Sequence, residues 1–492
     1  MSEAVTAFVD WPHAPLTKSL VEQALNSLLR SFNIQSLLVP QDFTANPTTK
    51  KLVQWATYDS IDHELTAQAR HSVLSSSYIF RKALIRKHFL SRMIHSYVTK
   101  HPGSLLARAV PRTWEMELAF ADEVDEMWTD ELFDLAEFLE GHIDSQPRWC
   151  ILKPGMADRG MGIRLFDSKE GLQSIFEEFE RSEDAEDEYD SSDTVVIVSQ
   201  LRHFVVQVRP LNVRNPTLFS RETGIPGEPP PTRPGAKCWK VYRQSPGIQG
   251  EIIPPAPCTF VWADPSCAKF HLRVYCVASG ALKVYLYTRI LALFSPVPFV
   301  LPEAGDSNPS LTPHLTNTSL QTDRGEAGVR LLDELVGCQI LSPGWDRKLK
   351  EEDTNDLIAQ IREILSETFK AALENPVHFQ VTLSIPPDSL SLRWLNLQPL
   401  PNAFELFGVD FLVTCEDSKL QPYLLEINSE PAIELTGPRL KWVLEDLFRG
   451  IARLAVEPHL PGGENLGRGE ALGREVHFLK CLDVEVRGEK GW

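Results

Sequence analysis

The chain has 492 residues, of which 43% are hydrophobic and 24% are charged, a composition typical of a globular protein with several domains. Its formal net charge of −18 argues against a general nucleic-acid binder, because contact with phosphates needs a basic surface. The eight cysteines form no CxxC pair, and the N-terminus lacks the basic and apolar regions of a signal peptide. The apolar stretch near residues 281–301 is broken by charges and prolines, so we expect a cytoplasmic protein without a membrane span.

The first hundred residues predict structural elements rather than chemistry. Residues 1–75 predict a small α/β unit that serves as a scaffold or as a partner surface. Residues 80–101 have apolar side chains near helical spacing, and the basic residues among them are Arg81, Lys82, Arg86, Lys87 and Arg92. Such a basic helix face is either simply solvated or, in so acidic a protein, a patch that attracts an anionic partner.

A lysine and two glycines between residues 148 and 166 form a candidate phosphate-binding loop. A predicted strand ends at Lys153, and a loop with Gly160 and Gly162 leads to a second strand. Glycines let the backbone approach phosphates closely and the lysine adds a positive charge, although the pattern is not a Walker loop and has low specificity alone. The following segment, residues 177–193, holds ten acids in seventeen positions, which indicates a solvated insertion.

The middle of the chain combines an irregular segment with regular elements. Residues 209–268 contain twelve prolines in sixty positions, so a disordered insertion is the simplest interpretation and a translated intron is the alternative. Residues 269–295 then predict two strands with Arg273 on the polar face. Residues 353–375 predict an amphipathic helix that backs a sheet.

The most informative stretch is residues 404–431, which predicts a β-hairpin with acids inside apolar strands. Asp410 lies in the first strand. In the second, Glu426 and Asn428 are two positions apart and share one face, whereas Leu425 faces the core. Two carboxylates and an amide oxygen suit a Mg²⁺ ion that is shared with nucleotide phosphates, and two solvent-facing edge acids are the alternative.

These residues also carry a family resemblance. FGVDFLV at residues 407–413 and LLEINSEP at residues 424–431 resemble the C-terminal signature of the tubulin–tyrosine ligase-like proteins, a branch of the ATP-grasp superfamily. In that family the corresponding aspartate, glutamate and asparagine hold the Mg²⁺ ions that bridge ATP. The resemblance therefore implies ATP and Mg²⁺ as cofactors and Asp410, Glu426 and Asn428 as the metal ligands.

The resemblance extends to further positions in the same order along the chain. The residues that it assigns to the nucleotide are Lys87, Lys153, Gly160, Gly162, Gln207, Lys269, Arg273, Arg289, Thr316 and Asn317. The sequence departs from the family at two places. His271 stands where the family has an aspartate, and Val208-Arg209-Pro210 replaces the usual adenine hinge.

The fold class implied by the resemblance is α/β of the ATP-grasp type, with the nucleotide between two mainly antiparallel sheets. The expected parts are an N-terminal α/β and helical region at 1–147, a central subdomain at 148–208 with the acidic insertion 177–193, the Pro-rich insertion 209–268, a C-terminal subdomain with the metal site at 269–458, and an extension at 459–492.

The family chemistry is the ATP-dependent formation of a peptide bond. A carboxylate attacks the γ-phosphate to give an acyl phosphate, and an amine then displaces phosphate, with Arg273 and Glu426 as the catalytic residues. By resemblance, the acceptor is the acidic C-terminal tail of tubulin, and the donor is a free amino acid, tyrosine in the first instance. Ligation with another amino acid or acceptor, and a non-catalytic ATP-binding scaffold, are the alternatives.

Overall fold

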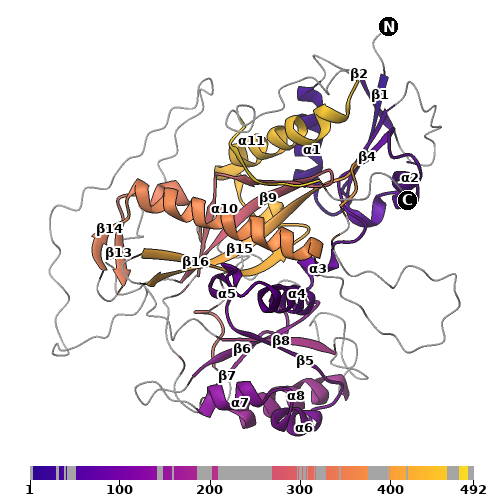
Figure 1. The fold of residues 1–492 in the computed structure, drawn as a ribbon. Coiled ribbons are helices and arrows are strands. Elements are labelled where there is room, and N and C mark those ends of the chain that lie inside the picture. The colour runs from indigo at the N-terminus through magenta and orange to yellow at the C-terminus, as the bar shows by residue number, and fades with distance from the viewer. Residues whose placement is uncertain are drawn as a thin grey trace, which may run out of the picture.

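The computed structural model contains two four-stranded sheets, one seven-stranded sheet and a two-stranded ribbon among the residues that it describes (Figure 1). These residues are 4–28, 33–37, 40, 51–140, 148–157, 160–184, 202–208, 269–295, 297, 302, 306, 309–314, 316, 328–342, 345–374, 397, 399–416, 419–461 and 476–485. The expected Pro-rich insertion at 209–268 lies outside them. Within the described part of the chain, no helix is both long enough and apolar enough to cross a membrane.

The N-terminal unit is a parallel sheet with strand order β2-β1-β3-β4. Its strands are β1 Ala4–Asp10, β2 Asn33–Leu37, β3 Lys51–Ala56 and β4 Val73–Ser75. Helix α1 (Pro15–Ser27) begins with a proline, whose fixed φ suits the first helical turn, and it buries Leu20 and Val21. The α/β unit predicted for residues 1–75 is therefore present.

The second four-stranded sheet, which we call the small sheet, is antiparallel with order β5-β8-β6-β7. Its strands are β5 Thr113–Glu117, β6 Cys150–Pro154, β7 Arg164–Phe166 and β8 His203–Val208, and its helices are α6 Glu123–Thr129, α7 Phe133–Glu140 and α8 Lys169–Asp184. Strand β5 precedes residue 148, where the central subdomain is expected to begin, so part of this sheet comes from the region assigned to the N-terminal part. Helix α8 continues into the first part of the acidic segment predicted as an insertion, and Phe179 is buried there whereas Glu177 and Glu178 are exposed.

The seven-stranded main sheet contains the predicted hairpin. Its strands are β9 Phe270–Ser279, β10 Lys283–Tyr287, β11 Leu291–Phe294, β12 Val329–Leu331, β15 Phe404–Glu416, β16 Lys419–Asn428 and β17 Phe478–Asp483. β15 and β16 pair antiparallel, which confirms the hairpin. β17, in the extension for which the sequence predicts no role, pairs with β10 and completes the sheet.

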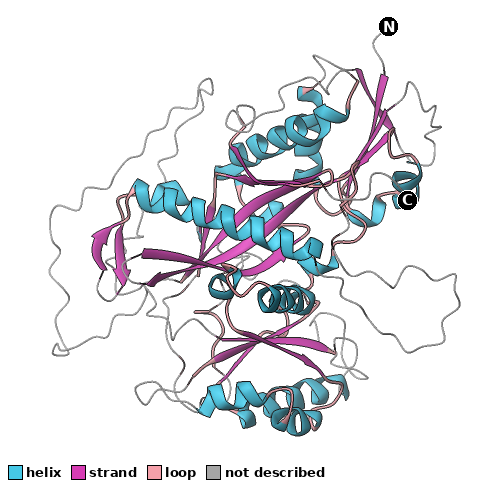
Figure 2. Cartoon of the chain, in the orientation of Figure 1, coloured by secondary structure: helices cyan, strands magenta, loops and turns pink. Residues whose placement is uncertain are grey.

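Helices pack on both faces of the main sheet because its central strand is apolar on both sides (Figure 2). On β9, Val274 belongs to the core that contains α10 (Glu351–Glu374), whereas Tyr275 belongs to the core that contains α11 (Lys441–Ile451) and α1. Helix α10 is the amphipathic helix predicted at 353–375. Its inner residues are fully buried, and each such aliphatic side chain stabilises the fold by roughly 1.5–3 kcal/mol.

The helix predicted at 80–101 is divided into α3 (Lys82–Ile85) and α4 (Lys87–Lys100). Arg86 between them has an extended backbone with φ −99° and ψ 121°, which ends one helix and begins the next. The N-terminal end of α4 contacts the small sheet, since the Lys87 N–H donates to the carbonyl oxygen of Gly155 at 3.3 Å. The break thus turns the start of α4 toward the loop that follows β6.

The basic residues of this segment do not form one surface. Arg81 is only 8% exposed, Arg92 pairs with Glu115 at 2.8 Å, and Lys87 faces an acid of β16. Neither interpretation of the basic face, solvated or partner-binding, holds for the whole set. Arg81, Lys87 and Arg92 each face a different carboxylate, whereas Lys82 is exposed.

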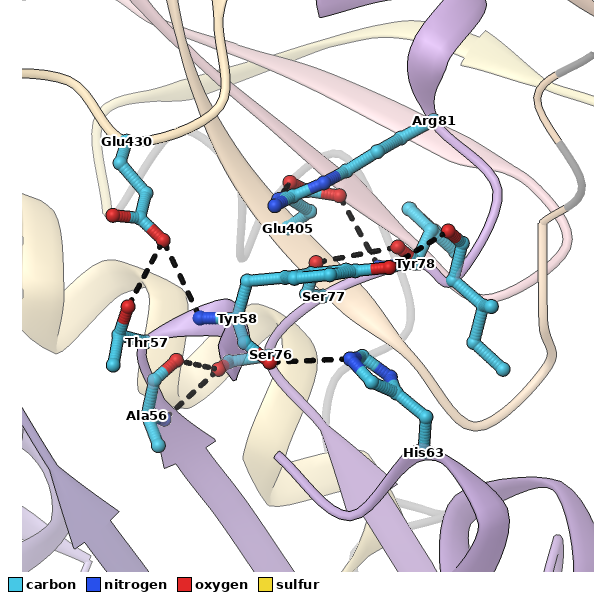
Figure 3. A network of polar contacts seen from close by, with 11 residues as sticks. Ala56, Thr57, Tyr58, His63, Ser76, Ser77, Tyr78, Arg81, Glu405 and Glu430 are labelled. Atoms are coloured by element: carbon cyan, nitrogen blue, oxygen red, sulfur yellow. Dashed lines mark hydrogen bonds and ion pairs between the residues drawn. The ribbon is translucent and has the colours of Figure 1, made fainter. Parts of the chain in front are cut away.

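Arg81 and Glu405 of β15 form a buried ion pair beside the N-terminal unit (Figure 3). Glu405 is 1% exposed and also accepts a hydrogen bond from the Tyr78 N–H at 3.2 Å, while the Arg81 guanidinium lies 4.2 Å from the centre of the Tyr58 ring. Burial raises the pKa of Glu405 to about 7, against the opposing effect of Arg81. The carboxylate therefore depends on Arg81 for its charge compensation.

Replacing Arg81 by methionine should destabilise the protein by about 3 kcal/mol, because the variant leaves a buried carboxylate without its partner. A carboxyl group with a raised pKa stabilises the fold at low pH and loses that contribution as the pH rises through about 7, so the loss should grow between about pH 5 and about pH 8. Urea denaturation of Arg81→Met and of Arg81→Met/Glu405→Gln at both pH values measures the loss in free energy of unfolding. The double variant should recover part of the loss, and an equal loss at both pH values would contradict this account.

Candidate functional site

The strand register places the candidate charged residues beside one another in the main sheet. Asp410 on β15 is paired with Arg273 on β9 and with Glu426 on β16. Directly paired residues of antiparallel strands project from the same face, so the three side chains gather on one face of the sheet. Gly408 pairs with Asn428, which brings the asparagine to that face two residues along.

Arg273 and Asp410 make a bidentate ion pair. The arginine Nε donates to Oδ1 at 2.5 Å and a terminal nitrogen donates to Oδ2 at 3.0 Å, while the two side chains are 13% and 3% exposed. Burial by itself would raise the pKa of Asp410, but Arg273 and, to a smaller extent, His271 outweigh burial and hold that pKa well below its ordinary value. Burial likewise opposes the charge of Arg273, and Asp410 outweighs it and raises the arginine pKa.

Glu426 faces two lysines from other parts of the chain. Lys87 of α4 lies 3.6 Å from its Oε2, and Lys153 at the end of β6 is 8% exposed. Burial would raise the pKa of Glu426, but the charges of Lys87 and Lys153 outweigh it and lower that pKa. Burial lowers the pKa of Lys153, with Glu426 acting in the opposite direction. The glutamate is thus charged at neutral pH.

The oxygens of Asp410, Glu426 and Asn428 fit a magnesium ion that is completed by a nucleotide. The Asn428 amide nitrogen lies 3.5 Å from Asp410 Oδ2, and Glu426 is paired with Asp410 across the hairpin, so the three side chains gather at one end of the strands. Among the described residues, no group of three or more His, Cys, Asp or Glu side chains could hold a metal by itself. Two carboxylates with one amide match the way Mg²⁺ is bound when phosphates supply the other oxygens.

His314 and Thr316, which precede the predicted nucleotide residue Asn317, border the same group. His271 is 2% exposed, its Nδ1 lies 2.5 Å from the Thr316 hydroxyl, and its Nε2 lies 3.5 Å from Asp410 Oδ1. Lys269 donates to the carbonyl oxygen of His314 at 3.0 Å. The histidine that replaces the family aspartate is therefore in direct contact with the candidate metal ligand.

The small sheet turns its second face toward this group. Leu152 and Val206 lie in the core with the helices of the small sheet, so alternation places Lys153 and Gln207 on the opposite face. Between that sheet, α3, α4 and the end of β16 lies a cavity of about 20 Å³, lined in part by Lys87, Glu426 and Asn428.

Other predicted residues lie apart or in the adjoining loop. Gly160 and Gly162 have φ of 79° and 69°, a left-handed conformation that favours glycine, in the turn between β6 and β7. Arg289 pairs with Asp446 of α11 at 3.1 Å and stacks on Trp442, so the structure does not bring it to Asp410. Asn317 and the hinge residues after Val208 lie outside the described residues.

Two features of the site were not predicted. A β-bulge between Asp410 and Phe411 shifts the register, so that Leu424 rather than Leu425 is in the core. Gly408 is required by packing, because a Cβ there would lie 2.7 Å from Pro431 Cβ. A glycine inside an apolar strand is the sequence signal that marks such a close approach.

Two facing sheets with this charged group between them define an ATP-grasp fold. A solved structure supports this class: the C-terminal domain of Pby1 from K. lactis, described as an ATP-grasp enzyme interacting with the mRNA decapping enzyme Dcp2, is similar with a TM-score of 0.58 and 27% identity. The similarity covers 98% of this chain and 100% of that one. The expected α/β ATP-grasp fold is confirmed.

Sequence comparisons give the family. Residues 263–462 match the model of the tubulin-tyrosine ligase family. A probable tubulin–tyrosine ligase of Schizosaccharomyces pombe is 32% identical over 82% of each chain. The probable tubulin–tyrosine ligase PBY1 of Saccharomyces cerevisiae is 31% identical over 98% of this chain, which spans about half (54%) of that relative's length. The chain belongs to the tubulin–tyrosine ligase family.

Replacing Asp410 by asparagine should destabilise the ligand-free protein by about 3 kcal/mol, because Arg273 would remain buried without an anion. Asp134→Asn is the control, since it removes the partner of the exposed Arg112 and should cost about 1 kcal/mol or less. Urea denaturation of both variants provides the comparison. Equal losses in the free energy of unfolding would show that the buried Asp410 pair stabilises the protein no more than an exposed pair does.

Proposed function

We propose that the protein is an ATP-dependent carboxylate–amine ligase that adds an amino acid, tyrosine in the first instance, to the C-terminal tail of tubulin. The observation that carries the proposal is the convergence of Asp410, Glu426 and Asn428 with Arg273 and Lys153 between two sheets. Such a group neutralises phosphate charge and leaves the carbon chemistry to the substrates.

The cations of the site bind and orient the phosphates in this proposal. Lys87 and Lys153 reach the site from outside the main sheet and offset charge on the nucleotide, while Arg273 supports the transferring phosphoryl group. Asp410, Glu426 and Asn428 would hold a Mg²⁺ ion, which would withdraw charge from the phosphates when bound. The small sheet and α4 exclude water from the closed site.

The reaction proceeds in two balanced steps. A carboxylate oxygen of the acceptor attacks the γ-phosphorus and forms an acyl phosphate while ADP leaves. The amine of the incoming amino acid then attacks the acyl carbon, phosphate leaves, and the amine loses a proton. Both reactants of the first step are anions, so positioning and charge neutralisation supply the catalysis.

The substrate assignment rests on the relatives. Both yeast relatives are named as probable tubulin–tyrosine ligases, and the matching family model is that of the tubulin-tyrosine ligase family. A ligation assay with labelled tyrosine, glutamate or glycine and tubulin as acceptor tests the donor directly. Incorporation of tyrosine supports the proposal, whereas incorporation of glutamate or glycine would replace tyrosine as the donor.

Calorimetry with Mg·ATP tests the site itself. The unmodified chain should bind in the micromolar range, and Glu426→Gln should weaken binding by at least about tenfold, or about 1.4 kcal/mol, because one charged metal ligand is lost. Glu445→Gln on α11, where Glu445 pairs only with Lys441 at 3.7 Å, is the control. If neither the unmodified chain nor Glu426→Gln binds, the ligase proposal fails.

A binding role without ligation is the second candidate. It is favoured by His271, which stands in place of the family aspartate and contacts Asp410. The K. lactis relative interacts with the mRNA decapping enzyme Dcp2, so the decapping enzyme is the partner proposed for this role. Copurification with that enzyme, together with no amino-acid incorporation into tubulin, would favour binding over ligation.

A further inference from the structure

The segment that follows the candidate metal-ligand strand docks on the N-terminal unit. β16 ends at Asn428, and residues 430–436 then run along the N-terminal unit. Two carboxylates of this segment, Glu430 and Glu434, accept hydrogen bonds from residues about four hundred positions away in sequence. Neither carboxylate has a role in the proposed metal or nucleotide site.

Glu434 caps the N-terminus of α1. Its carboxylate accepts the Thr17 N–H at 2.9 Å, the Thr17 hydroxyl at 3.1 Å and the Leu16 N–H at 3.3 Å. The helix has no cap of its own, since Ala14 precedes it and its first turn holds no acid. The free N–H groups and the positive end of the helix dipole are therefore satisfied by Glu434 from another part of the chain.

Glu430 binds the N-terminal unit at a second point (Figure 3). It accepts the Thr57 hydroxyl at 3.2 Å and the Tyr58 N–H at 3.3 Å, directly after the end of β3. Between the two glutamates, Ile433 is 3% exposed and lies in the same core as Val21 of α1. An apolar residue with a carboxylate on either side thus fixes the segment along the unit.

The same segment is packed against the candidate site. Pro431 lies so close to Gly408 that a Cβ on the glycine would be 2.7 Å from the proline Cβ, and Gly408 is the residue paired with Asn428. Only Ser429 separates Asn428 from Glu430. A shift of the segment therefore moves the end of β16 that bears the candidate metal ligands.

We propose that Glu430 and Glu434 are positioning residues, through which the N-terminal unit holds the metal-ligand end of β16 in place and sets its affinity for Mg·ATP. The inference rests on the proposed function for its effect on Mg·ATP. The docking itself is independent of any ligand. The N-terminal unit thereby gains a role in the site although it supplies no metal ligand.

Hydrogen exchange and Mg²⁺ titration of the full chain test this proposal together. Glu430→Ala and Glu434→Ala should speed amide exchange in residues 423–436 and raise the Mg²⁺ concentration for half-maximal ATP binding about threefold to tenfold, the factor that corresponds to loss of a helix cap. Glu434→Gln keeps an acceptor oxygen and should recover part of the effect. Glu64→Ala is the matched control, because the exposed Glu64 bonds only Gln68 of its own helix.

Two results would overturn the inference. One is unchanged exchange in residues 423–436 in both alanine variants. The other is a lower melting temperature with an unchanged Mg²⁺ requirement, because a merely structural contact would alter stability alone. If the unmodified chain binds no Mg·ATP, the proposed function fails, and the exchange rates then decide whether the docking holds the end of β16.

Discussion

The buried carboxylate of Asp410 is stable inside the main sheet because Arg273, on the neighbouring strand, binds both of its oxygens. This pair depends on the register of β9 and β15, since a shift by one residue would turn one partner to the opposite, apolar face. The two cores on either side of the sheet hold that register. The packing of α10 and α11 is thus a condition for the charged site as much as for stability.

The ligand-free site is neutralised by its own residues. Arg273 is paired with Asp410, and Glu426 lies near Lys87, so cations suited to phosphate and anions suited to magnesium offset one another. Binding of Mg·ATP in the proposed function exchanges partners instead of burying new unpaired charge, which reduces the desolvation cost.

The N-terminal unit joins this arrangement through contacts between distant parts of the chain. Arg81 compensates Glu405 inside the protein, and Glu434 caps α1 at the surface. Both contacts link the unit to strands or segments adjoining the candidate site. A parallel sheet without candidate chemistry of its own can therefore influence the position of the metal-ligand strand.

Local patterns in the sequence determined the hairpin and the helix α10, because alternation and helical spacing report which side chains are buried. The ATP-grasp class and the family followed from the resemblance of residues 407–413 and 424–431 to the family signature. Local patterns also placed Glu426 and Asn428 on one face, and the strand register of the structure added Asp410. Spacing within one strand cannot report which strand lies beside it, so the partner choices of Arg273, Lys87 and Arg81 followed only from the fold.

The tertiary structure decided three matters that sequence periodicity cannot reach. Because of the β-bulge in the hairpin, Leu424 and not Leu425 lies in the core. The extended backbone of Arg86 divides residues 80–101 into two helices, although their apolar spacing predicted one. Arg289 bound Asp446 instead of joining the nucleotide residues. In each case the outcome depends on contacts between distant segments. The sequence by itself thus determined which segments form strands and helices and which residues are charged. Only the folded chain decided which opposite charges meet, since that choice is set by the three-dimensional packing of the strands and helices.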